Sequence, residues 1–187
     1  ALMAIALGLV AMTNPTTVAL AVVGAVLATA YPLFKRITHG PQAVLGLAFS
    51  WAIPMAFTAL GQPLDASVVL WMAINVVWVL IYDTEYAMAD RQDDLKVGVK
   101  STALWLGRWD IRAIAGWMVL MVLLLAVAGS LGRTDGLWWL SVAVVAALFG
   151  RQLWMIRGRD PQACFQAFLF NHWVGLVIFL GIASQLI

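Results

Sequence analysis

Long apolar runs separated by short polar breaks extend along the whole chain. The runs lie at 1–12, 17–34, 42–60, 66–82, 111–131, 136–155 and 165–187. Every run after the first is close to the ~20 residues that a helix needs to cross the hydrocarbon core of a bilayer. The breaks carry turn-forming residues, as in TNPTT, THGP and GRDPQ. The pattern therefore predicts an all-α fold, a polytopic bundle of transmembrane helices.

The first run, ALMAIALGLV, is shorter than the others. It has no basic segment before it and no cleavage site, so it is not a signal peptide. It is typical of the second half of a membrane helix, and we expect the chain to be a piece of a longer protein. The gaps between the runs are too short for a soluble domain, so residues 1–187 are predicted to form a single transmembrane domain, incomplete at its N-terminus.

The composition agrees with a membrane protein. Hydrophobic residues make up 64% of the chain and charged residues 11%, whereas soluble domains carry about 25% charged residues. The single cysteine, Cys164, excludes an internal disulfide and a metal site built from several thiolates. We expect the lipid bilayer as a partner and no nucleic acid.

The basic residues predict the orientation of the chain. One set of loops and helix ends carries ten of them: Lys35, Arg36, Arg91, Lys96, Lys100, Arg108, Arg112, Arg151, Arg157 and Arg159. The other side carries Arg133 alone. An excess of Lys and Arg marks cytoplasmic loops. The chain is therefore predicted to be a multi-pass protein of a bacterial inner membrane, with the first set of loops in the cytoplasm and the C-terminus on the far side.

The stretch YDTEYAMADRQDDLKVGVKST, residues 82–102, holds five of the nine acidic residues. On a helix that continues the preceding span, Asp83, Asp90 and Asp94 fall within about 40° of one another. Asp90 and Asp94 are an i,i+4 pair, whose side chains lie one above the other. Asp93 points about 80° away from Asp83. The helix is expected to break at Gly98.

Carboxylates that crowd one stripe repel each other, and a divalent cation relieves that repulsion. Ligands that are all oxygen suit Mg²⁺, which takes one or two carboxylates together with waters and phosphate oxygens. The spacing is therefore compatible with a metal-bridged phosphate or diphosphate at the membrane surface. A solvated acidic loop explains the same residues equally well, and the residues alone leave both interpretations open.

Lysines and arginines stand near the acidic stretch. Lys96 and Lys100 follow it directly, and the neighbouring loop carries YPLFKR, in which Tyr31 and Lys35 are another i,i+4 pair. Because Pro32 disfavours α geometry at the residue before it, a kink is expected there. These bases are candidate diphosphate ligands, and ordinary anchoring of helix ends is the alternative.

The long acidic motif resembles the second aspartate-rich motif of the UbiA superfamily of intramembrane prenyltransferases, and in particular its 4-hydroxybenzoate polyprenyltransferases. YPLFKR matches the YxxxK element of that family, and GPQAVLGLAFSWAIPMAF and ACFQAFLFNHWVGLVIFLG are similar to its later spans. The resemblance covers essentially the whole chain. It implies a nine-helix bundle of which this chain lacks about the first two and a half helices.

The resemblance implies Mg²⁺-dependent transfer of a polyprenyl group from its diphosphate to 4-hydroxybenzoate, at the carbon ortho to the hydroxyl, in ubiquinone biosynthesis. It implies that Asp90 and Asp94 are metal ligands of the DxxxD type. Asp83 faces the same way and is expected to bind the metal through water or to act on the acceptor phenol. The first aspartate-rich motif of the family is missing from this sequence, so the chain by itself is expected to be inactive.

The resemblance also assigns roles to the bases. Tyr31 and Lys35 match the YxxxK diphosphate element. Arg36 is a candidate for holding the acceptor carboxylate, and Lys96 and Lys100 are further candidates for contacting the diphosphate.

Other functions remain open at this point. A prenyltransferase for a different aromatic or quinone acceptor is the nearest alternative, and a panel of acceptors would separate the two. A transporter would need ionisable groups near the middle of the bilayer, whereas this stretch lies at a helix end. A non-catalytic membrane scaffold is the third alternative. Asn75 and the pair Asn171–His172 lie within spans, where hydrogen bonding between helices is the simplest explanation.

Overall fold

The computed structural model describes residues 2–38 and 40–186, with the side chains of Met3 and Lys35 outside that description. Within these residues every regular element is a helix. In chain order they are α1 (Leu2–Ala11), α2 (Pro15–Ile37), α3 (Pro41–Ser50), α4 (Ala52–Ala59), α5 (Ala66–Ala89), α6 (Arg91–Val97), α7 (Thr102–Leu106), the 3-10 turn η1 (Gly107–Trp109), α8 (Asp110–Gly132), α9 (Gly136–Ile156), α10 (Pro161–Ala183) and the 3-10 turn η2 (Ser184–Leu186).

Six segments are long and apolar enough to cross a membrane. They are Pro15–Phe34, Pro41–Ala59, Ala66–Ala89, Thr102–Gly132, Gly136–Ile156 and Pro161–Leu186. The chain is therefore a multi-pass membrane protein, as the apolar runs predict. The first predicted run is the ten-residue helix α1, which is shorter than a span.

Two expectations about the continuity of helices differ from the structure. The run 42–60 is divided into α3 and α4 at Trp51; Pro54 follows within one turn, and a proline has no N–H for the helical ladder. Helix α2 continues without a break through Pro32, where a kink was expected, and ends at Ile37. Helix α5 continues beyond the apolar run 66–82 to Ala89, as expected of a helix that continues this span into the acidic stretch.

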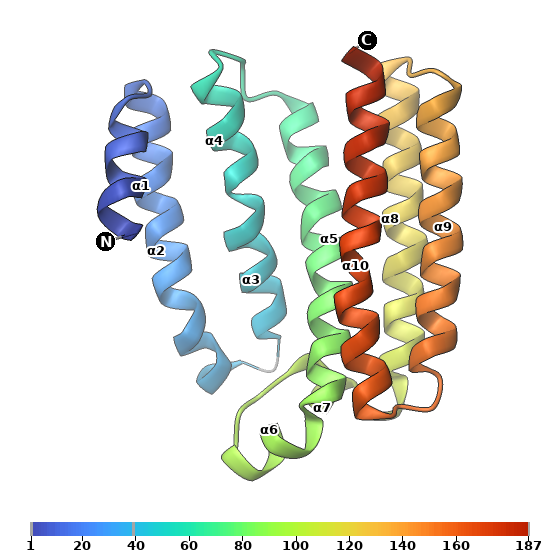
Figure 1. Ribbon diagram of the computed structural model, residues 1–187. Helices are drawn as coiled ribbons and strands as arrows, with labels where there is room; N and C mark the ends of the chain where they lie inside the picture. Colours follow the sequence, from blue (N-terminus) through green and yellow to red (C-terminus); the bar gives the residue numbers. More distant parts are fainter. Residues whose placement is uncertain (1, 39, 187) are drawn as a thin grey trace.

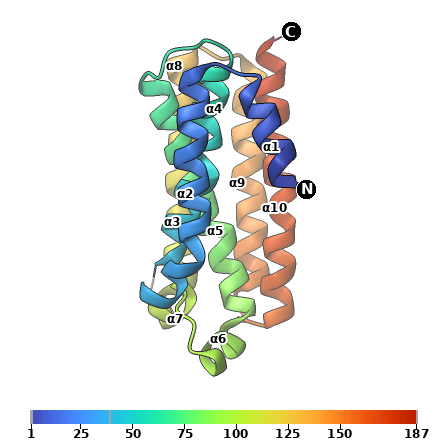
Figure 2. The same cartoon turned by 90° about the vertical axis from the view of Figure 1, so that its left-hand side faces the viewer.

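Helix α5 joins two groups of helices. It packs against α8 and α10 on one side and against α3 on the other, and Figure 1 shows α8, α9 and α10 beyond it on the right, with α3, α4 and α2 on the left. Helices α6 and α7 project from the lower end of the bundle, as Figure 2 also shows, whereas the C-terminus lies at the upper end. The acidic stretch is therefore at the lower end.

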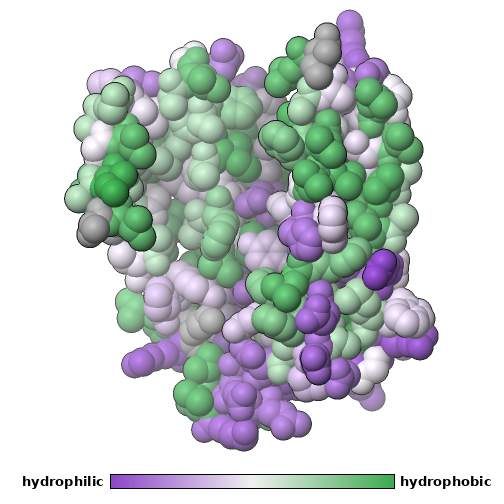
Figure 3. All heavy atoms as spheres, in the orientation of Figure 1, coloured by the Kyte–Doolittle hydropathy of each residue, from purple (hydrophilic) through white to green (hydrophobic). Residues whose placement is uncertain are grey.

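The hydrophobic core lies among α5, α8, α9 and α10. Its most deeply buried side chains include Ile81, Ile114, Leu125, Val145 and Val174, each at most 1% exposed. Large apolar side chains also cover the outside, and Figure 3 shows them spread over the middle of the molecule, with hydrophilic residues concentrated at the lower end. This distribution is the one expected of a helical bundle surrounded by lipid.

Gly46 permits a close approach of α3 to α5. A Cβ atom built on Gly46 would lie 3.3 Å from the Cα atom and the carbonyl oxygen of Val76. Small residues at helix contacts are a common device of membrane proteins, because they let backbones pack closely.

We expect Gly46→Leu to destabilise the protein by about 1–3 kcal/mol, because the new side chain must push α3 away from the backbone of α5. Thermal unfolding in detergent measures this change. Gly150→Leu is the matched control, since a Cβ atom there meets nothing within 4 Å. Equal melting temperatures for the two variants would contradict the close approach of the two helices.

Candidate active site

The acidic stretch bends at Asp90, where α5 gives way to α6. Asp90 has φ −85° and ψ 2°, and its carbonyl oxygen accepts the N–H groups of Asp93 and Asp94, each at 2.9 Å. Helix α6 then ends at Gly98, which has a left-handed φ of 73° and donates its N–H to the carbonyl oxygen of Asp94. The predicted helix break at Gly98 is confirmed, and the continuous helix expected over 83–94 has a bend in it.

Asp83, Asp90 and Asp94 line one cavity at this bend. All three are half-buried, whereas Asp93 is exposed. Gln42, at the start of α3, and Lys100, after α6, complete much of the wall. The cavity measures about 20 Å³, which is room for about one water molecule. The stripe predicted from helical spacing is thus present despite the bend.

These carboxylates do not converge on one point. Among the described residues, no three His, Cys, Asp or Glu side chains are grouped closely enough to hold a metal ion by themselves. Mg²⁺ rarely needs such a cage, because it keeps several waters and uses one or two carboxylates with substrate phosphate oxygens. The donor set of the cavity, which is all oxygen, therefore fits Mg²⁺ bound together with a phosphate group.

The back of the cavity is held by a chain of buried hydrogen bonds. The side-chain oxygen of Gln42 accepts the backbone N–H of Thr102 at 3.2 Å, and the hydroxyls of Thr102 and Thr84 lie 2.7 Å apart. Gln42, Thr84 and Thr102 are each at most 3% exposed. This chain fixes α3, α5 and α7 relative to one another behind the carboxylates.

Of the two lysines that follow the acidic stretch, Lys100 lines the cavity and Lys96 does not. Lys100 lines the cavity and donates to the carbonyl oxygen of Ile37 at 3.0 Å, which ties the end of α2 to the acidic stretch. Lys96 pairs instead with Asp93 at 2.9 Å, and both side chains are more than 70% exposed.

The residues of the YPLFKR segment lie on the last turns of α2. Tyr31 is half-buried and Arg36 is exposed. The side chain of Lys35 lies outside the described residues, so its predicted contact with diphosphate stays a prediction.

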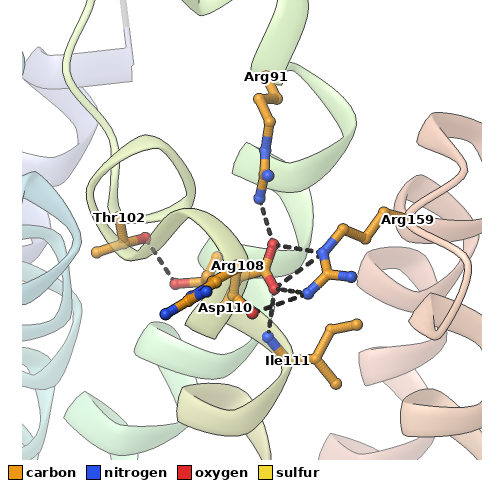
Figure 4. A network of polar contacts seen from close by, with 7 residues as sticks. Arg91, Thr102, Arg108, Asp110, Ile111 and Arg159 are labelled. Atoms are coloured by element: carbon orange, nitrogen blue, oxygen red, sulfur yellow. Dashed lines mark hydrogen bonds and ion pairs between the residues drawn. The ribbon is translucent and has the colours of Figure 1, made fainter.

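Asp110 is a buried carboxylate that the sequence analysis left without a role. It is 0% exposed at the start of α8, and it lies between the guanidinium groups of Arg91 and Arg159 (Figure 4). Arg91 donates one hydrogen bond to Oδ2. Arg159 donates from Nε to both oxygens at 3.1 Å and from a terminal nitrogen to Oδ1 at 2.7 Å. The hydrogen bond to Asp110 raises the pKa of Arg159 above its usual range.

Glu85 is the second buried carboxyl group that sequence analysis left without a role. It is 0% exposed, and its Oε2 accepts the side-chain N–H of Asn171 at 2.9 Å. The indole of Trp78 donates to the oxygen of Asn171 at 3.0 Å. Asn171 therefore links α10 to two positions of α5, which confirms hydrogen bonding between helices as its role. Asn75 also forms a hydrogen bond between helices: its side chain on α5 donates to the hydroxyl of Ser50 on α3 at 3.0 Å.

We expect Asn171→Ala to destabilise the protein by at least about 1–3 kcal/mol, because it removes the hydrogen-bond partner of a buried carboxyl group. Thermal unfolding in detergent is the measurement. His172→Ala is the control. His172 is exposed, and it contacts the Leu169 carbonyl oxygen and the Trp173 ring of its own helix rather than the neighbouring helix expected for it. A variant at Asn171 as stable as the one at His172 would show that the bond to Glu85 contributes nothing.

The comparisons with known proteins agree with this architecture. Residues 1–175 match the model of the UbiA prenyltransferase family. The 4-hydroxybenzoate octaprenyltransferases of Chromohalobacter salexigens and of Pseudomonas aeruginosa strain UCBPP-PA14 are both 51% identical to the chain, over 99% and 98% of its length. The chain spans 62% of the length of each of these relatives.

Two solved structures share the fold. The apo structure of a UbiA homolog from Aeropyrum pernix K1 aligns with a TM-score of 0.83 and 23% identity, covering 98% of this chain and 69% of the other. A digeranylgeranylglyceryl phosphate synthase structure aligns with a TM-score of 0.74 and 17% identity, covering 96% and 64%.

Proposed function

Because the chain belongs to the UbiA prenyltransferase family, we propose that the full-length protein transfers a polyprenyl group to 4-hydroxybenzoate as a step of ubiquinone biosynthesis. The donor is a polyprenyl diphosphate. The observation that carries the proposal is the cavity at the end of α5, which Asp83, Asp90, Asp94 and Lys100 help to line. The two relatives named for this activity, each 51% identical to the chain, support the choice of acceptor.

The bond that breaks joins the allylic carbon of the donor to a diphosphate oxygen, and the electron pair leaves with the diphosphate. The bond that forms joins that carbon to the ring carbon ortho to the acceptor hydroxyl, which then loses its proton. Mg²⁺, when bound, supplies positive charge that stabilises the leaving diphosphate. Asp90 and Asp94 are the proposed ligands of Mg²⁺. Asp83 is proposed to bind the metal through a water molecule or to act on the acceptor phenol.

The bases complete the proposed site. Lys100 is the cation that lines the cavity, and its placement supports a role at the diphosphate, where a fixed positive charge stabilises the transition state. Tyr31 and Lys35 are proposed to contact the same group from α2. Arg36, exposed at the end of that helix, is proposed to hold the acceptor carboxylate, and Lys96 is the most peripheral of the candidates.

The surroundings suit an allylic cation. Water would capture such a cation, and a site at the end of a membrane bundle limits its access. We propose that this end faces the cytoplasm of a bacterial inner membrane, because the elements that carry ten of the eleven Lys and Arg residues end there. The lipid-facing apolar surface supports a path for the isoprenoid tail.

We expect Asp90→Asn and Asp94→Asn in the full-length protein to lower the turnover number by a factor of about 10²–10³. Each substitution removes a negative charge that holds the metal, and a weakly held metal stabilises the leaving diphosphate less. The measurement is prenyl transfer to 4-hydroxybenzoate over a range of Mg²⁺ concentrations. Folding should be retained, since both side chains are half-buried at a polar helix end.

Asp93→Asn and Asp65→Asn are the matched controls. Asp93 belongs to the same stretch but is exposed, and Asp65 caps the opposite end of α5, where asparagine caps equally well. Both should keep wild-type turnover. Normal Mg²⁺-dependent turnover in Asp90→Asn and Asp94→Asn would make the stretch a solvated loop and remove the chemical basis of the proposal.

A further inference from the structure

The buried carboxylate of Asp110 is linked to the proposed metal ligands through a neighbour of Asp90, although Asp110 does not line their cavity. Its partner Arg91 is the first residue of α6 and directly follows Asp90. Its other partner, Arg159, comes from the connection between α9 and α10. A single carboxylate thus joins the bend of the acidic stretch to the start of α8 and to the connection between α9 and α10.

The buried carboxylate of Asp110 is compensated by two guanidinium groups. An ionised carboxylate without water must be compensated by charge and by hydrogen bonds, and removing one partner of a buried pair is strongly destabilising. Asp110 accepts from both guanidinium groups and, through Oδ1, from its neighbouring N–H at 2.6 Å. With Arg159 holding it from one side, Asp110 presents Oδ2 in a fixed position to Arg91.

The backbone of Arg159 has a conformation that favours glycine. Its φ is 54°, in the left-handed region, which costs a residue other than glycine about 1–2 kcal/mol. The residue before it, Gly158, does not occupy that region. The chain therefore places a guanidinium where glycine would be easier, and Arg159 also donates to the carbonyl oxygen of Arg108 at 3.0 Å.

We propose that Asp110 is a positioning residue, which holds Arg91 and thereby fixes the bend between α5 and α6 and the spacing of Asp90 from Asp94. The inference rests on the proposed function, because that function makes Asp90 and Asp94 metal ligands. Helix α6 needs such a restraint: its seven residues include none that is buried, and so short a helix is unstable by itself.

Three substitutions in the full-length protein separate the parts of this link. Arg91→Gln cuts the connection to the bend but leaves Asp110 paired with Arg159. Asp110→Asn keeps the shape and removes the charge. Arg159→Gly removes the second guanidinium but suits the left-handed backbone, so it should fold. Asp160→Asn is the matched control: it makes the same chemical change in an exposed cap of the same connection.

Two readouts report on the bend and on the metal. Hydrogen–deuterium exchange of residues 91–97 without metal should be faster in Arg91→Gln and Asp110→Asn than in wild type and in Asp160→Asn. The Mn²⁺ concentration for half-saturation, measured by electron paramagnetic resonance, should rise by about 10–100-fold, as is common when a group that orients a metal ligand is lost. The KM for 4-hydroxybenzoate should not change.

Unchanged exchange and unchanged Mn²⁺ affinity in Arg91→Gln would overturn the inference. A lower melting temperature with unchanged Mn²⁺ affinity would also overturn it, because Asp110 would then be a structural tie only. Failure of the proposed function gives a different result: wild-type protein that binds Mn²⁺ but transfers no prenyl group. In that case the losses of protection and of Mn²⁺ affinity in the variants would still support the positioning role.

Discussion

The lack of water in the bilayer is the constraint on which this structure depends. A polar group within the hydrocarbon gains most from a partner inside the protein, and Asn171 and Asn75 find theirs through bonds between helices, to Glu85 and to Ser50. The carboxylates of the acidic stretch lie instead toward one of the two ends of the bundle. Helix α5 extends from the packed core to one of these ends, so it can carry a stripe of carboxylates from lipid depth into the polar region.

That extension explains how a hydrophobic bundle can present a polar site. Asp83 lies on the last turns of α5, Asp90 at its end and Asp94 on α6, so one bend brings three carboxylates to one cavity. The surrounding elements hold the bend from two directions. The Gln42–Thr102–Thr84 chain supports it from α3 and α7, and Asp110 holds it from α8.

Local geometry made much of this predictable from the sequence. The spans follow from apolar runs, and the stripe of Asp83, Asp90 and Asp94 follows from helical spacing, which a single bend does not erase. The bonds to Asp110 were not predictable, because they join residues 19 and 49 positions apart. Arg91 and Arg159 had a sufficient explanation as cytoplasmic anchors, and a buried carboxylate at a helix start resembles an ordinary cap. Only the packing of α8 against its neighbours distinguishes these interpretations.

The central claim is that the carboxylates at the α5–α6 bend bind a divalent cation together with the donor diphosphate. Anomalous scattering at the manganese edge tests it most directly, in crystals of the full-length protein grown with Mn²⁺ and a non-reactive prenyl thiodiphosphate. The account predicts a peak within coordination distance of Asp90 or Asp94, about 2.0–2.6 Å from a carboxylate oxygen if Mn²⁺ behaves as other hard cations do. Ordered thiodiphosphate with its metal bound away from both residues would contradict it.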